Sequence, residues 1–227
     1  MKIVEINGHG LIEDFLTKGS VVIDLGANKG SFSKQISTFY ECQVYAVEAS
    51  PIIFEQTYSS NLVKKFNYAI CNHEEPIQIN ISDNSETTSL YRLNNCEYTQ
   101  SVTIQGTSLA GFLNKFAIQH PVTLKLDVEG AELEILKNSP SDVLKSFSQI
   151  TVEFHEWLGI GTKHDIEEII GRLNELGFYH FKLSRTNHGN DLFVNSARFS
   201  DADLINIRLQ LFFQMLRRIL RKILSKL

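Results

Sequence analysis

A short apolar strand that runs directly into a glycine-containing loop is the feature that most constrains the fold of this chain. Residues 21–25 form a β-branched run typical of a buried parallel strand, and the run ends at Gly26. Further strand-like and helix-like segments alternate along the chain after it. This alternation predicts an α/β fold with a mostly parallel sheet and helices on both faces.

The remaining segments can be assigned from their hydrophobic patterns. We expect strands at 21–25, 43–48, 66–70, 122–128, 149–154, 179–183 and 191–194. Helices are predicted at 10–18, 31–40, 107–117, 131–137 and 165–176. Ser31 is the predicted cap of the second helix, and Pro51 is predicted to open another. The polar segment 76–106 lacks a helical period and is interpreted as a hairpin or an irregular excursion.

Length and charge narrow the class of protein. The 227 residues suit one large domain, which we place at 1–200, followed by a separate C-terminal helix at 201–227. Hydrophobic residues make up 43% and charged residues 21%, as is ordinary for a soluble globular protein. The net charge of -4 provides no basic field, so we predict no nucleic-acid partner.

The three cysteines show no paired spacing. This argues against a disulfide framework or a structural zinc site and favours a reducing cytoplasm. Residues 1–10 lack the apolar run of a secretory signal, and no stretch approaches the roughly 20 apolar residues that span a bilayer. A cytoplasmic location is therefore predicted.

The glycine loop is the first candidate ligand site. Gly26 allows a tight turn and a close approach of ligand to backbone, and Gly30 lets the next helix pack near the strand. The backbone of Ala27 and Asn28, between them, is predicted to face the ligand. In open α/β sheets, ligands bind at the carboxyl ends of strands near such a loop.

An acidic residue ends the second predicted strand. Glu48 follows the loop by about 20 residues, the position at which dinucleotide-binding folds place an acid on the ribose hydroxyls. Ala49 and Ser50 after it, and Ala69 in the third predicted strand, complete the predicted cofactor-binding set. The alternative is that the glycines only make turns and that Glu48 is a solvated strand end.

The charges near the loop favour one nucleoside ligand over another. A nicotinamide fold needs a second glycine where this chain has Asn28, and Asp24 would repel a pyrophosphate. S-adenosylmethionine has no phosphate, and its ammonium and sulfonium suit Asp24 directly or through water. We therefore predict S-adenosylmethionine as the cofactor. A nicotinamide-dependent oxidoreductase and a non-catalytic nucleoside-binding module remain as alternatives.

Four motifs in this order resemble the FkbM-type methyltransferases. The segment 22–32, VIDLGANKGSF, resembles their opening motif, and 47–51, VEASP, is similar to the second, with Ala49 where the family more often has proline. The run 124–132, LKLDVEGAE, is close to their most distinctive signature, and 151–155, TVEFH, matches the strand that follows. The resemblance covers about residues 11–195.

The resemblance implies a Rossmann-like class I methyltransferase fold with one antiparallel strand near the sheet edge. It also implies methyl transfer from S-adenosylmethionine to an oxygen, often a hydroxyl of a sugar or natural product. Members differ widely in acceptor, so the small-molecule or glycan acceptor is not identified by it.

The predicted catalytic residues are Asp127, Glu129 and His155, at the ends of two predicted strands. Asp127 could contact the methionine end of the cofactor or the acceptor, and His155 or Asp127 is our first hypothesis for the base that takes the hydroxyl proton. Glu129 is the alternative base, and His155 could instead be a hydrogen-bonded support. Together with Glu153 these residues could hold Mg²⁺ or Mn²⁺, but their spacing is not diagnostic and no metal ligand is predicted.

Two further regions have open interpretations. The segment 82–89 either covers the acceptor or is an exposed hairpin, and Trp157 is either packed in the core or stacked on a sugar. From 204 to 227 the chain has six basic and no acidic residues, with apolar residues at helical spacing. This amphipathic helix is predicted to pack on the domain, to form a homodimer, or to contact a membrane surface.

Overall fold

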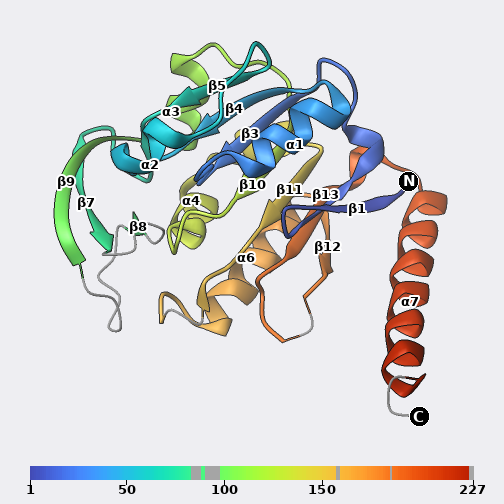
Figure 1. The fold of residues 1–227 in the computed structure, drawn as a ribbon. Coiled ribbons are helices and arrows are strands. Elements are labelled where there is room, and N and C mark those ends of the chain that lie inside the picture. The colour runs from blue at the N-terminus through green and yellow to red at the C-terminus, as the bar shows by residue number, and fades with distance from the viewer. Residues whose placement is uncertain (83–87, 90–97, 157–158, 185, 225–227) are drawn as a thin grey trace.

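A seven-stranded sheet forms the centre of the protein in a computed structural model, which describes residues 1–82, 88–89, 98–156, 159–184 and 186–224 (Figure 1). Its strands in spatial order are β12 (Phe178–Lys182), β13 (Asp191–Asn195), β11 (Gln149–Val152), β10 (Pro121–Leu126), β3 (Val21–Leu25), β4 (Gln43–Val47) and β5 (Val63–Phe66). Only β13 runs antiparallel to its neighbours in this sheet. The predicted α/β class, with one antiparallel strand near the edge, is confirmed.

Helices cover both faces of this sheet. The larger core lies between one face and α3 (Leu109–Lys115), α4 (Glu132–Asn138), α5 (Ser141–Ser146) and α6 (Lys163–Glu175). On the other face, α1 (Ser31–Tyr40) packs beside a hairpin of β1 (Ile3–Ile6) and β2 (His9–Ile12). Because strand side chains alternate, Lys125 and Asp24 point to the α1 side while Leu124 and Leu126 enter the larger core.

The N-terminal hairpin corrects the predicted helix at 10–18. Residues 9–12 form β2, and only Glu13–Phe15 make a short 3-10 helix. Asn7 and Gly8 have φ angles of 48° and 87°, the pair of positive angles that a two-residue hairpin turn requires. Pairing with β1 therefore overrides the helical spacing of the apolar residues that follow.

Two other local predictions differ from the structure. The predicted strand 66–70 is divided into β5 and β6 (Ala69–Ile70), and the side-chain amide of Asn67 donates to the carbonyls of Glu48 and Ala49. Gly30, with φ 80°, precedes α1, so Ser31 is the first helical residue and not the cap. Pro51 does open α2 (Pro51–Gln56), with the Ser50 hydroxyl as its cap.

A separate antiparallel arm extends from the sheet on the side of α2 (Figure 1). It pairs β7 (Pro76–Ser82) with β9 (Tyr98–Thr107), and β8 (Thr88–Ser89) pairs with β7. The predicted hairpin within 76–106 is confirmed. Residues 83–87, Cys96 and Trp157 lie outside the described residues, so the acceptor cover predicted at 82–89 falls mostly outside them.

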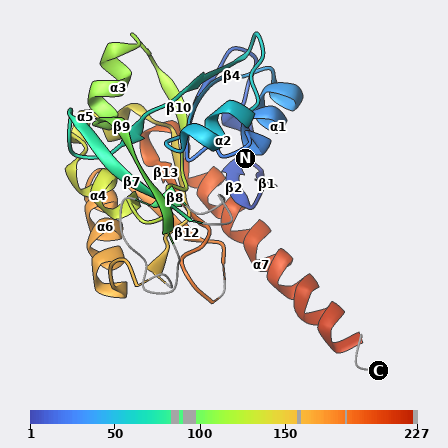
Figure 2. The same cartoon turned by 60° about the vertical axis from the view of Figure 1, so that its left-hand side comes forward.

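The last helix, α7 (Asp201–Leu224), leaves the body of the molecule from a point near the N-terminus (Figures 1 and 2). Leu204, Ile207 and Leu211 anchor its first half against the core near β12 and β13. No helix in the described part of the chain is both long and apolar enough to cross a bilayer.

Candidate active site

The loop after β3 passes very close to the end of β10. Gly26 has φ 74°, and a Cβ added to it would lie 1.7 Å from the carbonyl oxygen of Asp127. Gly30 meets the backbone of Tyr58 in the same way, at 2.8 Å. Any side chain at these two positions would push the loop away, which explains both glycines.

The predicted loop and the predicted acid meet in space. Glu48 is only 6% exposed, and its two carboxylate oxygens accept the backbone N–H groups of Asn28 and Ser50, each at 2.8 Å. Burial raises the pKa of Glu48, and these two hydrogen bonds oppose that rise. Each oxygen keeps a lone pair, so Glu48 can still accept hydrogen bonds from a ligand diol.

A pocket that is partly open to solvent lies at the carboxyl ends of β3, β4 and β10. Six of the predicted cofactor residues line it: Gly26, Asn28, Glu48, Ala49, Ala69 and Asp127. Glu129 also lines it, and so do Ile53, Tyr68 and Ile79, which the sequence analysis did not select. Among the described lining residues there are three carboxylates and no lysine or arginine, so the pocket suits a cation better than a pyrophosphate.

Asp24 does not reach this pocket. Its side chain is fully buried, accepts a hydrogen bond from Ser33 Oγ at 2.6 Å, and lies 3.1 Å from Lys125 Nζ. Asp24 therefore balances a buried lysine, whereas we expected it to face the cofactor. Ala27, Gly30 and Ser50 are likewise not part of the pocket lining.

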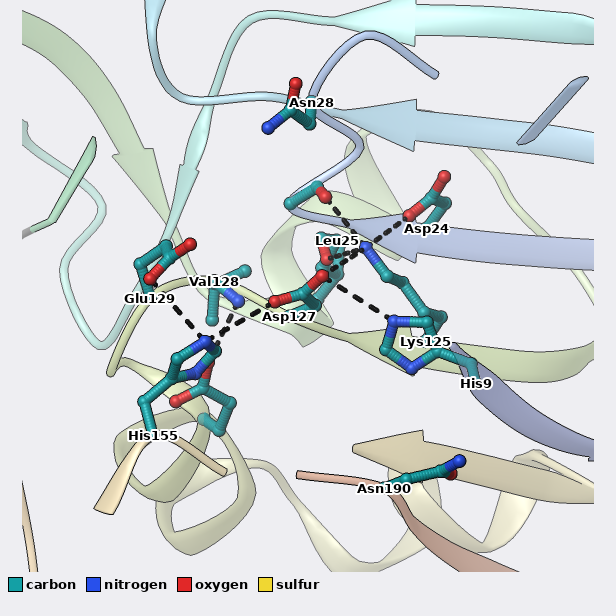
Figure 3. A network of polar contacts seen from close by, with 12 residues as sticks. His9, Asp24, Leu25, Asn28, Lys125, Asp127, Val128, Glu129, His155 and Asn190 are labelled. Atoms are coloured by element: carbon teal, nitrogen blue, oxygen red, sulfur yellow. Dashed lines mark hydrogen bonds and ion pairs between the residues drawn. The ribbon is translucent and has the colours of Figure 1, made fainter. Parts of the chain in front are cut away.

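Lys125 ties the glycine loop to the carboxylates (Figure 3). Its buried Nζ donates to the carbonyl of Gly26 at 2.7 Å and lies 3.4 Å from Asp127 Oδ2. Burial alone would lower the pKa of Lys125, but Asp24 and Asp127 raise it above its ordinary value. The lysine is therefore charged, and it holds the loop backbone in position.

Asp127 lies between Lys125 and His9 on one side and His155 on the other (Figure 3). Lys125 and His9 approach Oδ2, with His9 Nε2 at 3.6 Å, and His155 Nε2 lies 3.7 Å from Oδ1. Burial would raise the pKa of Asp127, but Lys125, His9 and His155 together hold it far below its usual range. His9 and Asp127 are over a hundred residues apart in the chain, so only the fold brings them together.

His155 is positioned by Glu132. The Glu132 carboxylate is 1% exposed, accepts the N–H groups of Val128 and Gly130, and lies 2.9 Å from His155 Nδ1. Burial would lower the pKa of His155, but Glu132 and the other nearby carboxylates raise it to about 9. A histidine that is already protonated at neutral pH cannot accept a proton, so this geometry favours the supporting role over the base.

Glu129 has the properties of a base. It has a left-handed backbone with φ 54°, lines the pocket, and has a side chain that is 32% exposed. Its Oε2 lies 3.5 Å from His155 Nε2. Burial raises the pKa of Glu129 to about 7, although the charge of His155 lowers it.

Two sets of possible metal ligands overlap at this site: His9, Asp127 and Glu153, and Asp127, Glu129 and His155. Both need Asp127, whose carboxylate already faces the charged Lys125 at 3.4 Å. A divalent cation would have to share that carboxylate with a fixed positive charge, and like charges in a low-dielectric site repel strongly. The arrangement therefore favours a pocket for an organic cation over a metal centre.

The family model described as the methyltransferase FkbM domain matches residues 24–179, which is more than half of the chain. The chain belongs to this family. It is therefore an S-adenosylmethionine-dependent methyltransferase, as the four motifs predicted. No curated protein matches the chain.

Several solved structures resemble this methyltransferase at low identity. Human methyltransferase 10 domain containing protein is 12% identical with a TM-score of 0.48, covering 81% of this chain and 78% of that one. TrmK of M. capricolum, in complex with S-adenosylhomocysteine, is 10% identical with a TM-score of 0.45, covering 83% and 67%. A TehB-like methyltransferase of Corynebacterium glutamicum is 9% identical with a TM-score of 0.45, covering 81% and 84%. Such distant likeness carries no information on substrate.

The pocket residues fit S-adenosylmethionine. Glu48 offers two free lone pairs where a ribose diol needs acceptors, and Val47, Ile53 and Ile70 provide an apolar wall for a flat base. Asp127, ionised and part of the lining, matches the positive charges of the methionine end. Among the described lining residues, this methyltransferase has no lysine or arginine to pair with a pyrophosphate.

Proposed function

We propose that this enzyme methylates a hydroxyl oxygen of a sugar, glycan or natural-product acceptor, with Glu129 as the base. When bound, S-adenosylmethionine supplies an electrophilic methyl group. The proposal rests on Glu129, because this pocket carboxyl has a pKa of about 7 and is partly ionised near neutral pH. A hydroxyl must lose its proton as its oxygen gains the methyl group, and a base of matched pKa is suited to accept it.

The other residues of the site bind and orient. Glu48 would hold the ribose hydroxyls, and Asp127 would attract the positive charges of the cofactor. Lys125 contacts both the Gly26 carbonyl and the Asp127 carboxylate and so fixes their positions relative to each other. His155 stays protonated while Glu129 takes the acceptor proton. The positive charge of His155 stabilises the carboxylate form of Glu129, which is the form that accepts the proton. Positioning of the acceptor oxygen in line with the methyl group would provide most of the acceleration.

Binding measurements test the cofactor half of this proposal. Calorimetry with S-adenosylmethionine, S-adenosylhomocysteine and NAD should give binding of the first two only. Glu48→Ala should weaken both by roughly tenfold to a hundredfold, because a ribose loses its charged acceptor. Glu55→Ala, on the outer side of α2, is the matched control. Binding of NAD in preference would support the oxidoreductase alternative.

Turnover measurements test the acceptor half. The full chain is incubated with labelled cofactor and a panel of sugar, glycan and polyphenol hydroxyl acceptors, with amine and thiol acceptors as controls. Label in an ether linkage to oxygen supports O-methylation. Label on nitrogen or sulfur alone would overturn it, and tight cofactor binding without turnover on any acceptor would favour the non-catalytic module.

We also propose that α7 places the enzyme on an anionic membrane surface, on the cytoplasmic side. Ile205, Leu209, Phe212, Phe213 and Leu220 are between 49% and 59% exposed and recur at helical spacing on one side of the helix. Leu204 and Ile207, which pack on the domain, fall on another side. The free, buried Cys42 and Cys71 suit a reducing compartment.

Charge favours a membrane over a second copy of the chain as the occupant of this apolar face. Residues 204–227 contain six basic and no acidic residues. Arg208 and Arg217 fall on either side of the apolar stripe, where two packed copies would bring like charges together without acids to pair them. An anionic lipid surface attracts the same charges, each contributing about 1 kcal/mol near the surface.

Vesicle binding tests this location. The full chain should co-sediment with phosphatidylglycerol vesicles and not with phosphatidylcholine vesicles, and salt should release it. Phe212→Glu with Phe213→Glu should abolish binding, whereas Phe39→Glu, on α1 and 70% exposed, should not. A concentration-dependent dimer that the Phe212/Phe213 variant dissociates, without vesicle binding, would overturn the membrane proposal.

A further inference from the structure

Three side chains converge at the edge of the central sheet, away from the cofactor pocket. His180 lies on β12, Asp191 begins β13, and His188 lies in the loop between these strands. Asp191 Oδ2 is 2.5 Å from His188 Nδ1 and 3.3 Å from His180 Nε2. None of the three lines the pocket, so this cluster is a second concentration of titratable groups.

The cluster contains buried polar atoms without hydrogen-bond partners among the described residues. Asp191 is fully buried, yet its Oδ1 has no donor, and the buried His180 Nε2 has no hydrogen bond of acceptable geometry. Leaving such groups unsatisfied in the protein interior is energetically costly. A buried carboxylate oxygen and a buried imidazole nitrogen that lie in one cluster, each without a hydrogen bond, are the arrangement expected around a cation.

We propose that His180, His188 and Asp191 bind a divalent transition-metal ion, with zinc as the best match to the ligands. One ligand atom from each residue lies within 4.8 Å of the other two. Two imidazoles and one carboxylate form a set that zinc accepts, with a fourth position left for water. The side chains of His180 and His188 are 18% and 13% exposed, which leaves a route for the ion from solvent.

Lys182 competes with the metal ion for the His188 imidazole. Its Nζ lies 3.3 Å from His188 Nε2, so without metal it donates to that nitrogen and leaves the ring proton on Nδ1, facing Asp191. Metal binding at Nδ1 requires that proton to leave this nitrogen and Nε2 to carry one. Lys182 is exposed and can turn toward solvent to allow this exchange.

The ion would stabilise the backbone around His155. The carbonyl of His188 accepts the N–H of Phe154 at 2.9 Å, and the N–H of His188 donates to Glu156 Oε1 at 2.9 Å. Asn190, in the same loop, accepts the N–H of Gly10 in the hairpin that carries His9. A metal that holds this loop in place therefore supports two histidines beside Asp127.

Metal titration of the chelator-treated full chain, without an affinity tag, tests the site. Zinc should bind at about one ion per chain, and cobalt should give visible absorption bands. His180→Gln and His188→Gln should each weaken binding at least tenfold, whereas His164→Gln, whose side chain is 78% exposed, should not. Glu129→Gln should also leave binding unchanged, which distinguishes this site from ligands around Asp127.

A gain-of-binding variant keeps the test independent of variants that fail to fold. Lys182→Gln removes the competing cation and lets an amide oxygen accept the Nε2 proton, so zinc should bind about tenfold more tightly. Zinc at a hundredfold excess over its dissociation constant should raise the melting temperature by roughly 5–10 °C. Absence of bound metal in both the wild type and Lys182→Gln, or cobalt spectra unchanged by the His180 and His188 variants, would overturn the proposal.

Discussion

The Glu132 carboxylate lies 2.9 Å from Nδ1 of His155, and this buried pair controls the charge beside Glu129. Glu132 also accepts the backbone N–H groups of Val128 and Gly130, so one carboxylate holds both the loop and the imidazole. The imidazolium in turn lies 3.5 Å from Glu129. Positioning and protonation are therefore coupled through residues in the loop after β10, on α4 and in the segment after β11.

Glu129→Gln should lower kcat by roughly 10²–10⁴-fold, because the glutamine cannot take the acceptor proton. In the wild type, kcat should rise with pH through about 7 as Glu129 ionises. The variant should lose this dependence and keep its affinity for S-adenosylhomocysteine within a few fold. A pH–rate profile with the same limb in both proteins would exclude Glu129 as the base.

His155→Gln should move the rise of kcat with pH to a higher pH. The charge of His155 lowers the pKa of Glu129, so its removal lets burial raise that pKa further. Steady-state rates between pH 5 and 9 measure the shift. If His155 were itself the base, the variant would lose the rate at every pH and no shifted limb would be seen.

His155 should also make stability depend on pH. Its pKa rises from 6.5 in the unfolded chain to about 9 in the folded protein. The side chain is only 5% exposed, so solvent screens its interactions little. A raised pKa contributes stability that is complete below pH 6.5 and is lost as the pH rises through 9. The free energy of unfolding of the wild type relative to His155→Gln should therefore fall by on the order of 3 kcal/mol between those limits.

Urea unfolding at a series of pH values measures that difference. His164→Gln is the control, because His164 is exposed on α6 and pairs with Glu168 of the same helix. A constant difference across the range would mean that His155 is neutral in the folded protein.

Gly26→Ala should destabilise the protein by roughly 2–5 kcal/mol and abolish cofactor binding. Its Cβ would overlap the Asp127 carbonyl at 1.7 Å, and φ 74° is strained for alanine. Gly171→Ala, in the middle of α6 with no atom within 4 Å of the added Cβ, should instead stabilise by about 0.5–1 kcal/mol. Thermal melts and calorimetry of the two variants measure their stability and their cofactor binding. Equal stability and equal binding in both would contradict the close approach of Gly26 to the Asp127 carbonyl.

Local sequence determined the elements whose signals lie within a few residues. β3 and α1 have the predicted bounds, because an apolar run, two glycines and an amphipathic segment follow one another. The helix predicted at 10–18 was wrong although Asn7-Gly8 is a hairpin signal. Pairing with β1 decided that segment, together with the hydrogen bond from Ile12 N to the Gln149 side chain of a distant strand.

For the site, the sequence by itself determined that the glycine loop, Glu48 and Asp127 come together at the ends of β3, β4 and β10, although it wrongly added Asp24 to the pocket. A parallel sheet aligns its strand ends, so the glycine loop, Glu48 and Asp127 could be placed from their positions alone. The tertiary structure alone decided which of them carry protons. The pKa values depend on burial and on partners far away in the chain, and His9 on β2 and Glu132 on α4 meet Asp127 and His155 only after folding.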